Sequence, residues 1–208
     1  YRRKVSSAFC GDAYSNPVQV MVLSALDTAS TSITDVACNG GSAGAITISP
    51  SGGLAPYNYA WSNGASTANL SGLTAGTYTV TITDDFSCAS LSLAFVVSQP
   101  NILATSVSTV SNVSCNGGND GAISVASSGG VASYNYNWSN GSTSSSLTGL
   151  TAGTYTVTTT DANGCTSALS QSVTQPSGLT AIISSSSNLS CNGGNDGSVV
   201  ASAAGGTA

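Results

Sequence analysis

Thr-Tyr-Thr-Val-Thr-Ile-Thr, residues 77–83, alternates threonine with larger apolar side chains along its whole length. This strict period of two predicts a half-buried β-strand, with the tyrosine, the valine and the isoleucine on the core face. The strand overlaps a longer segment, residues 72–81, which returns unchanged as residues 149–158. The repetition indicates a fold built from copies of one β-rich unit.

Two further motifs define the period. Cys-Asn-Gly-Gly begins at residues 38, 115 and 191, at spacings of 77 and 76 residues, and Trp-Ser-Asn-Gly occurs at 61–64 and 138–141. A period of this length predicts one small domain per repeat. We predict four segments: the C-terminal strands of a preceding immunoglobulin-like domain at 1–26, complete repeats at 30–103 and 104–179, and the start of a truncated third repeat at 180–208.

Each repeat is expected to form an immunoglobulin-like antiparallel β-sandwich. Short strands are separated by Gly-Gly and Asn-Gly turns, and one tryptophan, Trp61 or Trp138, lies in the middle of each repeat. The pattern Leu-x-x-Gly-x-Tyr at 73–78 and 150–155 is typical of a tyrosine corner. Gln-Pro closes each repeat, and the short linkers that follow predict a stiff, rod-like array of all-β modules.

The composition argues against catalysis. The chain has no histidine and no glutamate, and its basic residues are confined to Arg2, Arg3 and Lys4. General acid–base and nucleophilic mechanisms usually need such groups, so we expect no catalytic residues and no enzyme activity. The lack of a basic stripe argues against a nucleic-acid partner. No apolar run is long enough to span a bilayer, so we expect no direct membrane insertion.

The cysteines predict an oxidising, extracellular environment. Cys38 and Cys88 are 50 residues apart, and so are Cys115 and Cys165. This fixed spacing predicts one disulfide per module, Cys38–Cys88 and Cys115–Cys165. Metal binding is the alternative, but two cysteines per repeat do not supply the four ligands of a structural zinc site.

Taken together, these motifs resemble the SprB repeat of Bacteroidota cell-surface adhesins. The resemblance extends over about residues 30–208 and includes the Cys-Asn-Gly-Gly loop, the Trp-Ser-Asn-Gly turn, the tyrosine-corner pattern, Asp-Ala-Asn-Gly-Cys at 161–165 and the closing Gln-Pro. It implies a large extracellular adhesin at the cell surface, exported by the type IX system and connected with gliding motility. The implied partners are extracellular surfaces or polysaccharides, neighbouring repeats of the same chain, and the secretion and gliding machinery of the cell envelope.

The leading functional hypothesis is a stiff multivalent stalk for surface attachment and gliding. A purely structural spacer or a component of an extracellular filament is a second hypothesis, and an accessory array on a secreted hydrolase is a third. Flanking sequence would separate them, because a lectin or hydrolase domain favours the second or third and many more repeats favour the first.

Two candidate sites follow from local patterns. Asp-Thr-Ala at 27–29 matches the O-glycosylation pattern of Bacteroidota and is expected in a linker, with Thr28 as the acceptor. If Cys115 joined Cys165, oxygen atoms of Asn116, Asp120 and Asp161 would gather at one pole and could bind Ca²⁺. Turn formation by Asn, Asp and Gly is the competing explanation, and no other cofactor is expected.

Overall fold

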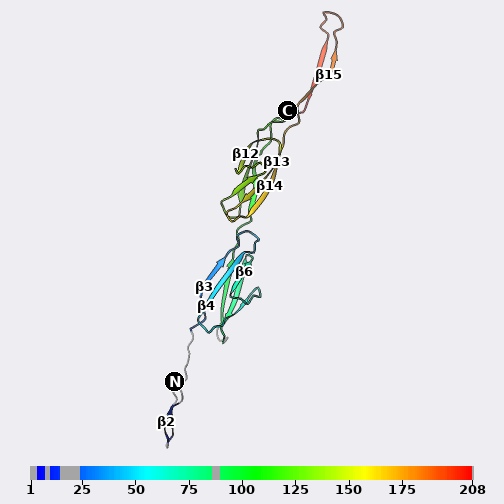
Figure 1. Ribbon diagram of the computed structural model, residues 1–208. Helices are drawn as coiled ribbons and strands as arrows, with labels where there is room; N and C mark the ends of the chain where they lie inside the picture. The colour runs from blue at the N-terminus through cyan, green and yellow to red at the C-terminus, as the bar shows by residue number, and fades with distance from the viewer. Residues whose placement is uncertain (1–3, 8–9, 15–23, 86–89, 208) are drawn as a thin grey trace. The chain divides into compact units, whose positions relative to one another are not determined.

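The regular elements of this chain are β-strands (Figure 1). The computed structural model describes residues 4–7, 10–14, 24–85 and 90–207, and contains no helix within those ranges that is long and apolar enough to cross a membrane. The expected all-β class is confirmed. At the N-terminal end, β1 (Lys4–Ser7) pairs with β2 (Cys10–Tyr14) as an antiparallel hairpin.

Within residues 24–85 and 90–98, the first module has six strands in two three-stranded antiparallel sheets. They are β3 (Asp27–Thr34), β4 (Gly44–Ser51), β5 (Asn58–Trp61), β6 (Asn69–Leu73), β7 (Gly76–Thr83) and β8 (Ser90–Val97). The strand order is β3-β4-β6 in one sheet and β5-β7-β8 in the other. The two sheets enclose the core, as expected for a β-sandwich.

The second module repeats this topology. Its strands are β9 (Ala104–Ser111), β10 (Gly121–Ser128), β11 (Asn135–Trp138), β12 (Ser146–Leu150), β13 (Gly153–Thr160) and β14 (Thr166–Val173). They form sheets of order β12-β10-β9 and β11-β13-β14. A further hairpin follows, made by β15 (Thr180–Ser187) and β16 (Ser198–Ala204), which correspond to β9 and β10.

The alternation seen in the sequence produces the core of each module. In β7, Val80 is 1% exposed and Ile82 is fully buried, while Thr79 and Thr81 face outward. Trp61 lies against Phe95, with ring centroids 6.0 Å apart. Its indole N–H donates a 2.8 Å hydrogen bond to the Thr67 carbonyl, so the ring is buried without leaving its polar atom unpaired.

The tyrosine corner is present in both modules. The Tyr78 hydroxyl donates to the Thr74 carbonyl at 3.0 Å, and the Tyr155 hydroxyl donates to the Thr151 carbonyl at 3.0 Å. Each bond ties the loop before a central strand to that strand. This feature and the double-sheet topology confirm the expected immunoglobulin-like sandwich.

The first and last strands of a module run in the same direction. The Val113 N–H, just after β9, donates to the Thr174 carbonyl, just after β14, at 2.9 Å. The Thr174 N–H in turn donates to the Asn112 side chain at 3.0 Å. The C-terminal ends of β9 and β14 therefore meet at one end of the module. Because β14 has eight residues, its beginning lies about 25 Å away, at the other end.

The compact units do not coincide with the sequence repeats. One unit comprises residues 1–36 and 42–98, and the other comprises 37–41 and 99–208. The segment that carries the first Cys-Asn-Gly-Gly loop thus belongs to the second unit, although the predicted repeat places it in the first. The rod-like array stays a prediction, and so does the assignment of residues 1–26 to a preceding immunoglobulin-like domain.

Truncating a core residue of the second module should destabilise that module strongly. Ile123 in β10 is fully buried, and Ile123→Ala should lower the free energy of unfolding by about 2–5 kcal/mol because it leaves a cavity. Val110, its partner in β9, is 43% exposed, and Val110→Ala should cost about 1 kcal/mol or less. Urea unfolding followed by Trp138 fluorescence in a Trp61→Phe background measures both. Equal losses would contradict the assigned core.

Candidate functional site

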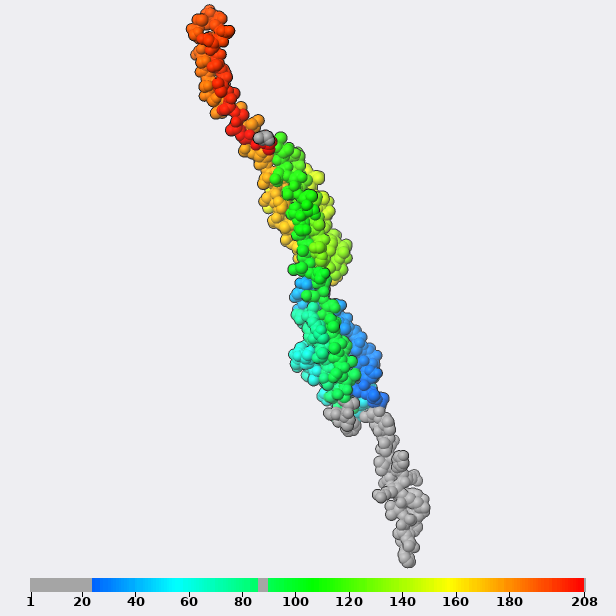
Figure 2. Space-filling model, turned by 180° about the vertical axis from the view of Figure 1, so that it is seen from behind, coloured from blue at the N-terminus to red at the C-terminus, as the bar shows by residue number. Residues whose placement is uncertain are grey.

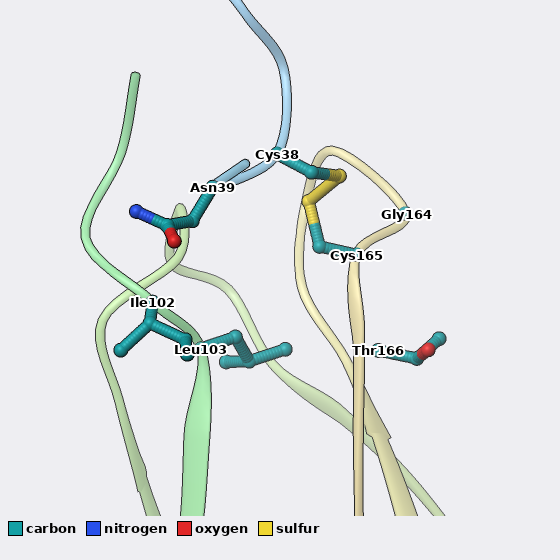
Figure 3. A pocket seen from close by; sticks show the side chains of 7 residues that line it. All are labelled: Cys38, Asn39, Ile102, Leu103, Gly164, Cys165 and Thr166. Carbon is teal, nitrogen blue, oxygen red and sulfur yellow. A yellow bond between two sulfur atoms is a disulfide. The ribbon is translucent and has the colours of Figure 1, made fainter. Parts of the chain in front are cut away.

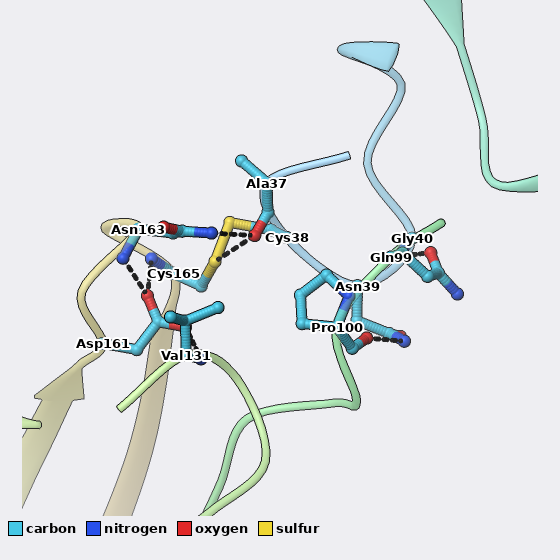
Figure 4. The surroundings of a disulfide bond; sticks show 10 residues. All are labelled: Ala37, Cys38, Asn39, Gly40, Gln99, Pro100, Val131, Asp161, Asn163 and Cys165. Carbon is cyan, nitrogen blue, oxygen red and sulfur yellow. Dashed lines mark hydrogen bonds between the residues drawn. A yellow bond between two sulfur atoms is a disulfide. The ribbon is translucent and has the colours of Figure 1, made fainter. Parts of the chain in front are cut away.

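The most distinctive local feature is a disulfide between Cys38 and Cys165 (Figure 4). The S–S distance is 2.01 Å and the Cα atoms are 5.7 Å apart, within the usual range for a disulfide. Cys38 lies in the loop after β3, and Cys165 lies directly before β14. The bond therefore joins the first cysteine of one sequence repeat to the second cysteine of the next.

The predicted pairs Cys38–Cys88 and Cys115–Cys165 are wrong. Cys115 follows β9 and Cys165 precedes β14, and these strands run in the same direction, so the two cysteines lie at opposite ends of the second module. The length of β14, about 25 Å, far exceeds the Cα separation that a disulfide spans. Cys88 lies outside the described residues. Cys115 is exposed and unpaired in the structure.

The first Cys-Asn-Gly-Gly loop is held by the closing Gln-Pro motif. The Gly41 N–H donates to the Cys38 carbonyl at 3.0 Å, which closes a β-turn with Gly40 at φ 74°. A glycine suits this position because other residues rarely adopt a positive φ. The Gly40 N–H donates to Gln99 Oε1 at 2.8 Å, and the Asn39 side-chain amide donates to the Pro100 carbonyl at 3.0 Å.

These roles of Asn39 and Gln99 were missed in the sequence analysis. There the Gln-Pro motif was expected only to close each repeat. A usable signal was present, because Cys-Asn-Gly occurs in each repeat and a Gln-Pro pair closes both complete repeats. Residues that recur together at a fixed separation are candidates for a shared hydrogen bond.

The loop that presents Cys165 is organised by Asp161. This carboxylate is only 3% exposed, and it accepts hydrogen bonds of 2.9 Å from the N–H groups of Val131, Asn163 and Cys165. The Val131 N–H has the largest effect in holding the pKa of Asp161 below its ordinary value, and burial opposes it. Asp161 therefore serves as an acceptor for backbone groups that burial would otherwise leave unpaired.

A further contact joins the two loops beside the disulfide. The Asn163 side-chain amide donates to the Ala37 carbonyl at 2.9 Å. The Cys165 sulfur also lies 3.5 Å from that carbonyl oxygen, but it has no hydrogen to donate because it is bonded to the other sulfur. The disulfide is thus supported by one amide hydrogen bond across the same junction (Figure 4).

A cavity of about 360 Å³ opens next to the disulfide (Figure 3). It is lined by Cys38, Asn39, Ile102, Leu103, Gly164, Cys165 and Thr166. None of these side chains is a free acid, base or thiolate, so the lining offers packing and hydrogen bonding rather than acid–base chemistry.

The three residues predicted to bind Ca²⁺ have separate partners. Asp120 accepts the Ser114 N–H at 3.0 Å, and hydrogen bonds from Ser114 lower the pKa of its carboxyl. The Asn116 amide donates to the Pro176 carbonyl at 3.1 Å, while Asp161 binds the backbone of its own loop and of Val131. Within residues 24–85 and 90–207, no three His, Cys, Asp or Glu side chains form a metal-binding group. Calcium binding stays an untested prediction.

Thr28 lies in a strand rather than in the expected linker. It is the second residue of β3, pairs with Pro50 of β4, and is half-buried. Its backbone N–H donates to the Asp27 carboxylate at 2.7 Å. Because β3 is an edge strand, one side of its backbone is not covered by a neighbouring strand. Glycosylation of Thr28 stays a prediction.

Peptide mapping should recover the Cys38–Cys165 link and no Cys115–Cys165 link. Pepsin suits the experiment, because the chain lacks trypsin sites after Lys4 and acid slows disulfide exchange. In the chain-entropy model, closing a loop of this length stabilises the fold by about 5 kcal/mol. Cys38→Ser should therefore lower the thermal midpoint, whereas Cys191→Ser should leave it unchanged. A Cys115–Cys165 peptide in the parent chain would overturn the assignment.

Replacing Asp161 should destabilise the second module in a pH-dependent way. Its lowered pKa in the folded chain means that its stabilising effect is fully present above the ordinary pKa of aspartate and is lost as the pH falls through the lowered value. Asp161→Asn should thus reduce stability at pH 7, with a difference from the parent that shrinks in acid. Thermal unfolding between pH 2 and pH 7 measures this. Asp85→Asn, at an exposed turn in the first module, is the control; a pH-independent loss for Asp161→Asn would contradict the role.

Comparison with known protein families gives one match, in three segments of the chain. Residues 30–66, 107–143 and 183–208 match the family model described as SprB repeat. No curated protein sequence matches the chain.

Several solved structures are similar at low sequence identity. Three N-terminal domains of the bacteriophage RB49 highly immunogenic outer capsid protein match at 17% identity and a TM-score of 0.47, over 88% of this chain and 70% of that chain. A C-terminal fragment of intimin, in complex with the intimin-binding domain of its translocated receptor, matches at 15% identity and a TM-score of 0.36. The match extends over 72% of this chain and 66% of that chain. The N-terminal eight Ig domains of Down syndrome cell adhesion molecule match at 10% identity and a TM-score of 0.39, over 73% of this chain and 25% of that chain.

Proposed function

Since the three matched segments make this chain a member of the SprB-repeat family, we propose that it is a repeat region of a secreted adhesin, acting as a multivalent stalk for attachment to surfaces. In this role the modules bind rather than catalyse. Each module contributes a weak contact, and the array adds them, because tethered copies bind with a high effective concentration.

The observation that carries this proposal is the Cys38–Cys165 disulfide. It ties one sequence repeat covalently to the next, in addition to the peptide linkage between them. A chain of independent binding domains has no need of such a bond, whereas an array that must stay assembled outside the cell does. Disulfides also persist in oxidising surroundings, which supports a location at the cell surface.

The family context extends the proposal to the route and the movement of the protein. Export by the type IX system, an origin in Bacteroidota and movement along the surface of a gliding cell are the properties that the sequence resemblance implies. They belong to the proposal, together with the secretion and gliding machinery as partners.

The solvent face of the sheet β11-β13-β14 in the second module suggests how a module contacts a polysaccharide. Exposed hydroxyl groups lie in cross-strand pairs on β13 and β14: Thr154 is 3.1 Å from Ser172, and Thr156 is 2.9 Å from Ser170. Rows of hydroxyls can exchange hydrogen bonds with the hydroxyls of a hydrated glycan. They carry no charge, so such binding would be insensitive to salt.

Binding of the full chain to immobilised polysaccharides and to abiotic surfaces tests the proposal. Saturable binding is expected to be weak for the 208-residue chain and about tenfold tighter or more when several copies are joined end to end. Replacing both threonines by the isosteric valine, Thr154→Val with Thr156→Val, should weaken glycan binding severalfold while the fold is retained.

A matched control keeps the interpretation specific. Thr105 lies in β9 of the opposite sheet, and its hydroxyl bonds across the core to the buried Thr159 of β13. Thr105→Val should leave glycan binding unchanged. If neither the single chain nor the joined copies bind any surface, the attachment proposal fails and the modules act as spacers for a binding domain elsewhere.

A further inference from the structure

The surroundings of Cys115 reproduce those of the first Cys-Asn-Gly-Gly loop. The Asn116 amide donates to the Pro176 carbonyl at 3.1 Å, and the Gly117 N–H donates to Gln175 Oε1 at 2.8 Å. In the first loop the corresponding distances are 3.0 and 2.8 Å. The second loop is therefore held by the Gln-Pro motif that closes its own repeat, in the same way as the first loop is held by Gln99 and Pro100.

The difference between the two loops is the sulfur atom. Cys38 is bonded to Cys165, whereas the Cys115 thiol is exposed and unpaired in the structure. A cavity of about 220 Å³ lies beside Cys115 and is lined by Leu179 among others. Leu179 is 72% exposed, while Leu103, its counterpart at the disulfide, is 9% exposed. The loop at Cys115 has the same hydrogen bonds as the loop at Cys38, but it lacks a partner loop like the one that presents Cys165.

One face of the hairpin β15–β16, which is drawn in orange and red in Figure 2, also carries exposed apolar side chains. Val199 is 66% exposed, but its counterpart Ile123 in β10 is fully buried. Leu189 is 53% exposed, while its counterpart Val113 is 3% exposed. In the second module these positions are covered by the sheet β11-β13-β14, so strands of that kind are the occupant that fits the open face.

We propose that Cys115 is a cross-linking site that forms a disulfide with the second cysteine of a further module, one whose first two strands are β15 and β16. The partner is the cysteine of an Asp-x-Asn-Gly-Cys loop, presented directly before the last strand of that module. The bond forms when the two thiols lose two electrons and two protons to the disulfide of an oxidant, such as oxidised glutathione or a thiol oxidoreductase, which is reduced to two thiols.

Strand direction excludes a bond between Cys191 and the second cysteine of its own module. Cys191 follows β15 just as Cys115 follows β9, so it lies at the end where the last strand of its module finishes. The second cysteine of that module lies at the other end, about 25 Å away. The bond must therefore connect adjacent repeats. Cys191 would in turn bond to the second cysteine of the repeat that follows its own.

An extended chain tests the proposal directly. Residues 1–206 are followed by a second copy of residues 131–176, which supplies the second half of a module after Gly206, the counterpart of Gly130. After oxidation with a glutathione redox buffer, non-reducing peptic mapping should show the added copy of Cys165 bonded to Cys115. Iodoacetamide should modify Cys115 in the parent chain and at least tenfold less in the extended chain, while Cys191 reacts in both.

A second chain tests the same disulfide in case the added half-module of the first chain does not fold. Residues 1–179 followed by residues 104–208 add a complete natural module, in which the added copy of Cys165 should again bond to Cys115. Serine in place of that added cysteine should restore the reactivity of Cys115 and leave the Cys38–Cys165 bond intact. Pairing within the added module, or a reactive Cys115 in this chain, would overturn the proposal.

Discussion

Strand direction is the constraint on which the rest of this structure depends. In each module the first and last strands run the same way, as the bond between the Val113 N–H and the Thr174 carbonyl demonstrates for β9 and β14. A cysteine after the first strand and a cysteine before the last strand are therefore separated by the length of the module. No local adjustment of loops can close that distance, so each cysteine needs a partner from another repeat.

The polar residues around the junction follow from the same arrangement. A loop that leaves one repeat to meet another carries backbone groups outside any sheet, and these groups need partners. Gln99 and the Pro100 carbonyl accept from Gly40 and Asn39, and Asp161 accepts from the Cys165 N–H in its own loop. Satisfying the backbone in this way positions the two sulfur atoms for a bond of ordinary geometry.

The sequence predicted the parts of the fold that depend on local pattern. Alternation located β7 and its core side chains, and the Leu-x-x-Gly-x-Tyr pattern located the tyrosine corner, because both depend on residues close in the chain. The edge strand β3 was not identified, since nearly all its side chains are exposed and no alternation marks it.

The disulfide was mispredicted for a physical reason. A spacing of 50 residues recurs in both repeats, but it contains no information on which end of a sandwich each cysteine occupies. That depends on topology, which no local pattern encodes. Asp161 was recognised as important, yet its role as a backbone acceptor depends on Val131, which is 30 residues away in the chain.

The Cys38–Cys165 bond also decides which part of the chain bears a mechanical load. A pull on the two ends passes along the backbone to Cys38, across the sulfur atoms and onward from Cys165, so residues 39–164 lie in a closed loop that carries no tension. Strands β4 to β13 belong to this closed loop, and β3 and β14 are the strands directly before and after it in the chain. The bond removes roughly 400 Å from the extended length of the chain, at about 3.4 Å per residue. A stretched array would thus yield at edge strands while the greater part of two modules stayed unloaded.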